Sequence, residues 1–179
     1  IDVNLRDQNG NTALILACCN GDTETVELLL QKVDLNVNAQ GFKKFTALIF
    51  ASLNGHRDIV RLLLLKKYGG VWADATLLCK KPLDEWLPNT KFWAWSYNNP
   101  VKKGNKLISS WFLAAKPDSY IINKWTEAAL NYWENRKRMH NYFWVHDLFT
   151  DLVVEDSRFR QLWDSIKTNP KMTDATLLH

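Results

Sequence analysis

The chain has 179 residues, of which 46% are hydrophobic and 23% charged, and its formal net charge is +4. These values are typical of a globular chain with room for one domain or two small ones. The weak, dispersed charge does not favour a nucleic-acid-binding protein, and the longest apolar run, Leu62 to Leu65, is too short to span a membrane. The three cysteines and the absence of a secretion signal in the opening residues predict reduced thiols and a cytoplasmic location.

Composition changes sharply after Lys66. Residues 1–66 carry equal numbers of basic and acidic side chains and contain neither Trp nor Pro, whereas the remainder contains all nine Trp and all five Pro. Such a change predicts a domain boundary, with one domain at residues 1–66 and a second at residues 67–179.

The first domain repeats itself at an offset of 34 residues. The pairs that match are Thr12 with Thr46, Ala17 with Ala51, Gly21 with Gly55, Val26 with Val60, and Leu28-Leu29 with Leu62-Leu63. Each block predicts a short helix, a glycine turn and then a longer amphipathic helix. We expect Thr to cap the first helix, Ala to allow close helix contact, and the Leu pair to fill the space between repeats.

This pattern resembles the ankyrin repeat, which implies a scaffold that binds a protein partner. Two repeats are fewer than the three that a solenoid normally needs to bury its apolar faces. Either further repeats precede these two, or the second domain covers the last one.

A chain segment rich in glycine and tryptophan opens the second domain. The helix that begins at Asp58 ends at Gly69-Gly70, and a short buried strand is predicted at 71–73 with Asp74 directly after it. A carboxylate at the end of a buried strand is a common ligand of a divalent cation in α/β folds. A second apolar stretch follows at 77–79, and Pro82 then opens a helical turn.

Further downstream, alternation and periodicity predict strands at 91–96 and 109–114, and helices at 120–136, 140–154 and 156–166. The fold class is therefore α+β. The aromatic side chains of 91–95 favour core packing, although aromatic rings also stack on sugars. No Walker-type loop, zinc-binding Cys/His spacing or nucleophile elbow occurs, so the catalytic residues stay unknown.

The segment from Asp58 onward resembles the DXD-type sugar-binding region of GT-A glycosyltransferases, and more narrowly the capsular polysaccharide synthesis proteins. The motifs that carry the resemblance are Asp58-x-x-Arg61, Tyr68-Gly69-Gly70-Val71-Trp72, Asp74-Ala75-Thr76, Pro82-Leu83-Asp84, Ser109-Ser110-Trp111-Phe112 and residues 142–149. The resemblance implies a hexose transferase that uses a nucleotide-sugar donor, a glycan acceptor and Mn²⁺ or Mg²⁺.

The resemblance also implies roles for particular residues. Asp74 would bind the metal, with Thr76 in place of the motif's second acid, and Asp58, Arg61 and Trp72 would contact the donor sugar. Asp58 and Arg61 are three residues apart on one helix, so they could equally pair with each other. The helix at 58–66 is thus shared by the last repeat and the transferase region.

The aromatic stretch near the C-terminus contains His146 and Asp147, which are candidate substrate contacts, although a histidine among aromatic residues is also typical of a core position. A GT-A enzyme needs an N-terminal βαβ half that holds the nucleotide, whereas residues 1–57 here form repeats. We therefore expect two ankyrin hairpins followed by a truncated GT-A-like portion with impaired transfer. The alternative is a non-catalytic interaction module that carries a relic transferase domain.

Overall fold

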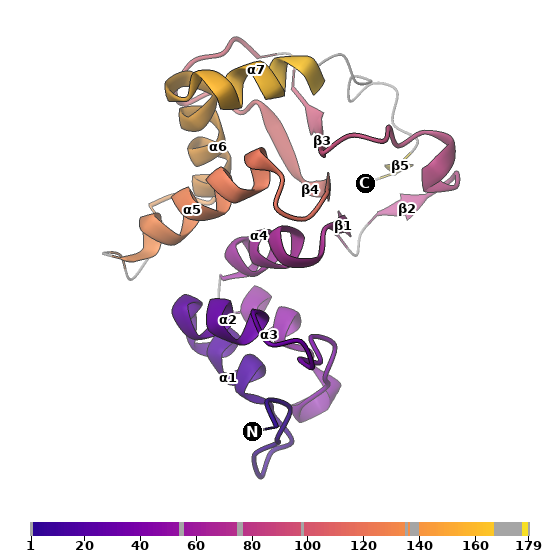
Figure 1. Ribbon diagram of the computed structural model, residues 1–179, viewed down its shortest axis with the longest axis vertical. Helices are drawn as coiled ribbons and strands as arrows, with labels where there is room; N and C mark the ends of the chain where they lie inside the picture. The colour runs from indigo at the N-terminus through magenta and orange to yellow at the C-terminus, as the bar shows by residue number, and fades with distance from the viewer. Residues whose placement is uncertain are drawn as a thin grey trace. The chain divides into compact units, whose positions relative to one another are not determined.

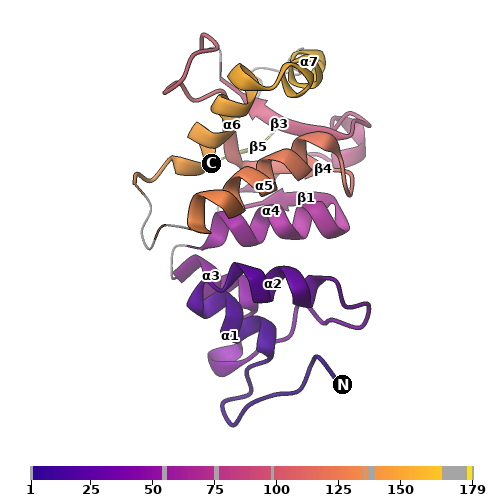
Figure 2. The same cartoon turned by 60° about the vertical axis from the view of Figure 1, so that its left-hand side comes forward.

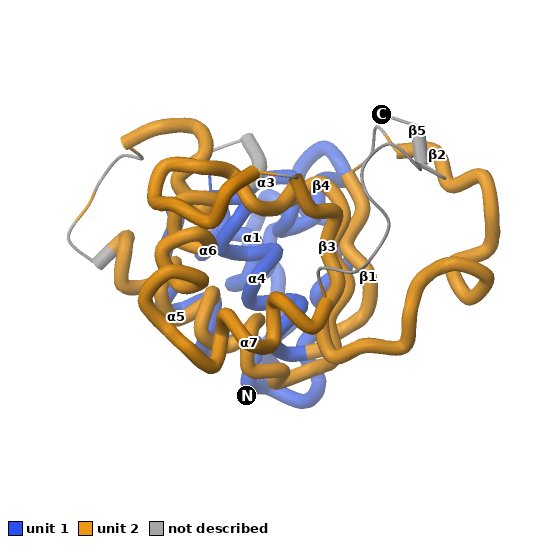
Figure 3. Tube along the Cα trace, turned by 90° about the horizontal axis from the view of Figure 1, so that it is seen from above, with its two compact units in different colours: residues 1–67 blue, residues 68–179 orange. Residues whose placement is uncertain are grey.

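A computed structural model describes residues 2–53, 56–74, 77–97, 99–134, 136, 140–166 and 177–178. The chain forms two compact units, residues 1–67 and residues 68–179, which Figure 3 shows in blue and orange. The first unit is helical, and the second combines helices with antiparallel strands. The predicted α+β class is confirmed.

The first unit contains two helix hairpins. Its elements are α1 (Ala13–Asn20), α2 (Thr23–Leu30), the 3-10 turn η1 (Phe42–Lys44), α3 (Ala47–Leu53) and α4 (Arg57–Tyr68). Helix α1 packs against both α2 and α3, and an ion pair between Lys66 Nζ and Glu27 Oε1 (3.3 Å) joins α4 to α2. The two hairpins predicted from the repeat are therefore present.

The repeated residues act locally in the way the pattern predicts. Thr12 Oγ1 accepts a hydrogen bond from the backbone N–H of Ile15 (3.4 Å), which caps α1. Gly21 ends that helix with φ 69°, and a Cβ at this position would lie 2.3 Å from the His56 ring. A left-handed backbone and this close approach both require glycine.

The core of the first unit is aliphatic, and Ala17 and Ala51 are buried in it as predicted. Leu62 and Leu63 are also buried, and Leu29 is half-buried, but Leu28 is 54% exposed, so the prediction is wrong for Leu28. The buried face of α2 carries Val26 and Leu30, which are four residues apart, and Leu28 lies between them on another face.

Cys18 is also part of this aliphatic core, and burial raises the pKa of its thiol to about 12.

The second unit is built on a small antiparallel sheet. Strands β1 (Gly70–Ala73), β4 (Ile108–Ala115) and β3 (Phe92–Ser96) pair in that order, and β2 (Leu78–Cys79) pairs with β5 (Leu177–Leu178). The 3-10 turn η2 (Leu83–Glu85) precedes β3. Helices α5 (Tyr120–Glu134), α6 (Trp144–Glu155) and α7 (Ser157–Ile166) complete the unit (Figure 1).

Aromatic side chains fill the space between the helices and the sheet. Helix α6 packs against β4 and against both α5 and α7 (Figure 2). The Trp125 ring meets the rings of Phe92 and Phe149 at centroid distances of 6.3 and 5.0 Å, and its Nε1–H donates to the carbonyl of Val145 (2.9 Å). A fully buried indole therefore keeps its hydrogen bond.

A second aromatic cluster lies among Trp93, Trp95 and Phe112, with Trp86 packed against it. Because Phe92 joins the first cluster and Trp93 the second, both faces of β3 are covered. The first four residues of the strand are buried, which confirms core packing for residues 92–95.

Two expectations for the second unit are corrected. Strand β1 is not buried: Val71 is 39% exposed, because β1 lies at the edge of the three-stranded sheet and pairs with β4 alone. Helix α6 begins at Trp144 rather than at residue 140, because residues 140–143 form a turn in which Asn141 Oδ1 accepts from the backbone N–H of Phe143 (2.6 Å).

Candidate functional site

The carboxylate of Asp74 lies directly after the edge strand β1. Its backbone N–H donates to the carbonyl of Trp111 on β4 (2.9 Å), and its own carbonyl accepts from the N–H of Leu77 (3.0 Å). The indole Nε1–H of Trp72 donates to Asp74 Oδ1 (2.7 Å). Side chains two residues apart lie on the same face of a strand, so the local backbone brings Trp72 and Asp74 together.

These contacts give Asp74 a fixed, half-buried carboxylate. Thr76, the other predicted metal ligand, lies outside the described residues. Among the described residues no group of three His, Cys, Asp or Glu side chains could hold a metal ion. Mg²⁺ is commonly bound by one or two carboxylates together with waters and substrate phosphates, and the single carboxylate of Asp74 is compatible with that arrangement.

The two predicted donor-sugar residues of α4 contact each other. Arg61 Nη1 lies 3.3 Å from Asp58 Oδ1, and the Arg61 side chain is only 1% exposed. Because removal of one partner would leave the other charge buried and unpaired, replacement of either residue alone should destabilise the fold. The structure thus confirms the pairing that the spacing allows, while the contact with a sugar stays a prediction.

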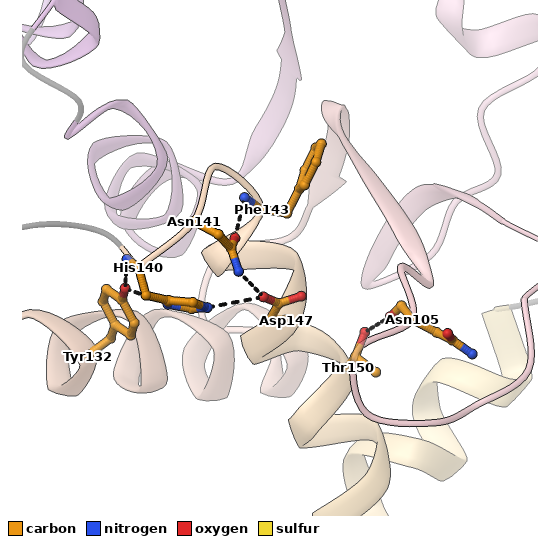
Figure 4. A network of polar contacts seen from close by, with 7 residues as sticks. All are labelled: Asn105, Tyr132, His140, Asn141, Phe143, Asp147 and Thr150. Carbon is orange, nitrogen blue, oxygen red and sulfur yellow. Dashed lines mark hydrogen bonds and ion pairs between the residues drawn. The ribbon is translucent and has the colours of Figure 1, made fainter.

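Asp147 belongs to a network of polar contacts between α5 and α6, which Figure 4 shows. Its Oδ2 accepts a hydrogen bond from Asn141 Nδ2 (2.9 Å) and lies 3.4 Å from His140 Nε2. On the other side of the imidazole, His140 Nδ1 lies 2.7 Å from the hydroxyl of Tyr132, which also accepts the backbone N–H of His140 (2.8 Å). The side chains of Tyr132, His140, Asp147 and Asn141 are thereby connected in that order.

An open hollow of about 680 Å³ lies beside this network. Tyr132, His140 and Asp147 line it together with Asp151, one helical turn farther along α6, and Arg136 beyond the end of α5. Burial raises the pKa of Asp151, and the neighbouring carboxylates of Glu155 and Asp147 raise it further, against the opposing effect of Lys103. The hollow is therefore lined by both a cation, Arg136, and carboxylates, those of Asp147 and Asp151.

His146 takes a different position from Asp147. It is buried, its ring meets the Phe143 ring at 5.7 Å, and it is not among the residues that line the hollow. Of the two candidate substrate contacts, the structure therefore brings only Asp147 to the hollow.

Sequence reasoning missed Tyr132, His140 and Asn141. In the sequence Tyr132 is one more aromatic position of an amphipathic helix. His140 and Asn141 lie at the start of the predicted helix at 140–154, in the part that forms a turn in the structure. A signal was present in Asn141, because asparagine is typical of a turn that precedes a helix. The pairing itself depends on how α5 and α6 pack, which local patterns do not specify.

Comparison with known families gives two matches. The model of the ankyrin repeat matches residues 9–41, and the model of the capsular polysaccharide synthesis protein matches residues 36–177. A search of curated proteins finds no match. In the described part of the chain, none of the helices has the length and apolar character needed to cross a bilayer.

The second match includes Asp58, Arg61, Trp72, Asp74 and the polar network around Asp147, and it extends over more than half of the chain. The protein therefore belongs to the capsular polysaccharide synthesis protein family and carries an ankyrin repeat at its N-terminal side.

Proposed function

We propose that this chain is related to the glycosyltransferases that transfer a hexose from a nucleotide sugar to a glycan acceptor, and that it binds the donor while its own transfer activity is impaired. The observation that carries the proposal is the carboxylate of Asp74, fixed by the Trp72 indole at the end of β1 in a chain of the capsular polysaccharide synthesis family.

In this proposal Asp74 binds Mn²⁺ or Mg²⁺, and Thr76, two residues farther along the chain, is the second ligand. The cation would offset the negative charge of the donor's diphosphate when that group leaves. The Trp72 indole holds the Asp74 carboxylate in one orientation, which reduces the entropy lost on binding. Asp58 and Arg61 would contact hydroxyl groups of the donor sugar.

The hollow at the α5–α6 network is the proposed contact region for the glycan acceptor. Sugars present many hydroxyl groups, each a donor and an acceptor, and Asp147, Asp151 and His140 offer matching groups along one open surface. The side chains of His140 and Asp147 are 52% and 27% exposed, so both can be reached by a ligand.

Metal-dependent donor binding tests this function. We expect nucleotide hexoses with Mn²⁺ to raise the unfolding free energy by about 2.7 kcal/mol at 100 times the dissociation constant. The substitution Asp74→Asn should abolish this stabilisation without unfolding the chain. Asp84→Asn, which removes an exposed carboxylate of η2, is the matched control and should retain it.

Equal stabilisation of the wild-type chain and the Asp74→Asn variant would show that Asp74 is not a ligand. We also expect the 179-residue chain by itself to release no measurable nucleoside diphosphate, because its first unit forms helix hairpins rather than a nucleotide-binding βαβ half. Transfer depends on holding the donor carbon about 3–3.5 Å from the attacking oxygen, so loss of positioning removes most of the rate. Turnover that Asp74→Asn eliminates would contradict this expectation.

The ankyrin repeat at residues 9–41 supports a second candidate, a non-catalytic interaction module. The same measurements of unfolding free energy separate the two functions. An interaction module would gain no stability from any nucleotide hexose with Mn²⁺, and Asp74→Asn would then behave like the wild type.

A further inference from the structure

A second hollow, of about 430 Å³, lies where β4 leads into α5. The end of β4 and the start of β3 meet there, because the backbone N–H of Lys116 donates to the carbonyl of Lys91 (2.9 Å). Helix α7 supplies another part of the wall through Arg158, Leu162 and Ile166. Three separate elements therefore enclose this space.

The charge of the lining is strongly positive. Lys91, Lys116 and Arg158 are cations, against a single carboxylate, Asp118. Within the described part of the chain, none of these three cations takes part in an ion pair. The guanidinium of Arg158 lies 4.2 Å from the centre of the Tyr120 ring, which holds it beside the start of α5. The carboxylate of Asp156 already accepts a hydrogen bond from the Tyr120 hydroxyl (2.8 Å).

The N-terminus of α5 opens into the same hollow. Helix α5 has 15 residues, and its first backbone N–H groups have no partner within the helix. The partial positive charge of a helix N-terminus favours an anion.

Ser119 gives an independent sign of a missing ligand. It directly precedes α5, lines the hollow and is only 6% exposed, yet its hydroxyl makes no hydrogen bond to any described residue. A serine at this position normally caps the helix through its hydroxyl oxygen. A buried hydroxyl without a partner costs free energy, which a bound acceptor oxygen would recover.

We propose that this hollow binds a phosphate group through Lys91, Lys116, Arg158, the Ser119 hydroxyl and the first N–H groups of α5. The hollow is larger than one phosphate, and Ile121, Leu162 and Ile166 give it an apolar side for the rest of a ligand. The ligand class is therefore a phosphate ester or diphosphate, either of a sugar or of a lipid.

This site goes beyond the proposed donor site and does not use Asp74. In the β1–β4 ladder Gly70 pairs with Ala115, next to Lys116, whereas Asp74 contacts Trp111. Four residues of strand separate the two positions, about 13 Å. The hollow and Asp74 thus lie at opposite ends of the same strand pair.

Calorimetric titration of the 179-residue chain with pyrophosphate, in buffer containing EDTA, tests the site without any contribution from a metal at Asp74. We expect saturable binding that Lys116→Gln weakens about tenfold, since a charge-assisted hydrogen bond is lost. Lys102→Gln, which removes the same charge from an exposed loop outside the hollow, should leave the affinity unchanged. Absence of saturable binding, or equal weakening by both substitutions, would overturn the proposal.

The Ser119→Ala variant distinguishes a ligand contact from a helix cap. If the hydroxyl serves the ligand, the variant keeps or raises the melting temperature of the free chain and binds pyrophosphate less tightly. A lower melting temperature with unchanged binding would assign Ser119 to capping and overturn its role in the site. Titration with geranyl diphosphate and with glucose 1-phosphate then identifies the source of the phosphate. Tighter binding of geranyl diphosphate supports a lipid ligand, and tighter binding of glucose 1-phosphate supports a sugar ligand.

Discussion

In the described part of residues 1–67 the largest buried hydrophobic side chains are aliphatic, whereas in that of residues 68–179 they are aromatic. The aliphatic contacts join equivalent helices of neighbouring repeats, such as α1 and α3. The aromatic contacts join elements that are not related by a repeat, as Phe92 of β3, Trp125 of α5 and Phe149 of α6 do. The first unit is therefore stabilised repeat by repeat, while the second depends on a few large rings that hold different elements together.

The largest effect should come from the aromatic unit. We expect Trp125→Ala to lower the unfolding free energy by about 3–5 kcal/mol, because it leaves a large cavity and removes the hydrogen bond to Val145. All nine tryptophans lie after residue 66, so their fluorescence during urea unfolding reports on the second unit alone. A loss below about 1 kcal/mol would contradict a central role for this ring.

The aliphatic unit should respond to Leu62→Ala. Leu62 is 1% exposed, and we expect a loss of about 2–5 kcal/mol. Circular dichroism follows the helices of both units, and the tryptophan signal follows only the second. If the fluorescence transition shifts as far as the circular dichroism transition, the two units do not unfold independently, and the contrast between them must be revised.

A smaller effect is expected where α7 begins. Asp156 Oδ1 accepts from the backbone N–H of Phe159 (2.9 Å), and this bond, with the Tyr120 hydroxyl, lowers the pKa of Asp156 below its ordinary value of 3.8. We expect Asp156→Ala to cost about 1 kcal/mol at neutral pH. A carboxylate with a lowered folded-state pKa stabilises the fold above its unfolded pKa and loses that contribution as the pH falls through the folded-state pKa.

The difference in stability between the wild type and Asp156→Ala should therefore shrink below pH 3.8, as urea unfolding at pH 7 and pH 3 would show. Asp164→Ala, farther along α7, is the control and should have little effect, since its ion pair with Arg160 is largely exposed. A difference that persists unchanged at pH 3 would mean that the charge of Asp156 is not what stabilises α7.

The smallest effect is expected for Leu28→Ala. Leu28 is the repeat counterpart of Leu62, yet it is 54% exposed, so its replacement should change the unfolding free energy by less than about 0.5 kcal/mol. The pair Leu28 and Leu62 thus tests whether burial or membership of the repeat pattern determines stability. Equal losses in the two variants would favour the pattern.

The sequence predicts those parts of the fold that depend on neighbours along the chain. The caps at Thr12 and Gly21 follow from local hydrogen bonding and backbone conformation, and the predicted strand at 91–96 differs by one residue from β3. The exposure of β1 could not be predicted, because an edge strand and a central strand of this length look alike until the pairing is known.

The residues of the candidate site likewise fall into those that the sequence predicts and those that it does not. Asp74 and Asp147 could be singled out from their motifs, and the Trp72–Asp74 contact follows from two-residue spacing on a strand. The contacts of Asp147 with His140 and of His140 with Tyr132 could not be found, because they depend on the packing of α5 against α6 and on the turn between them. The unpartnered hydroxyl of Ser119 also becomes visible only when its surroundings are known.

The rate at which the buried thiol of Cys18 is alkylated reports on local unfolding of the first unit. Only a thiolate attacks an alkylating reagent, and with a pKa of about 12 this sulfur is almost entirely protonated at neutral pH as well as shielded from the reagent. Cys79, on the exposed strand β2, has no such shield. Cys79 should therefore be alkylated before Cys18. The rate for Cys18 then measures how often the helix hairpins open.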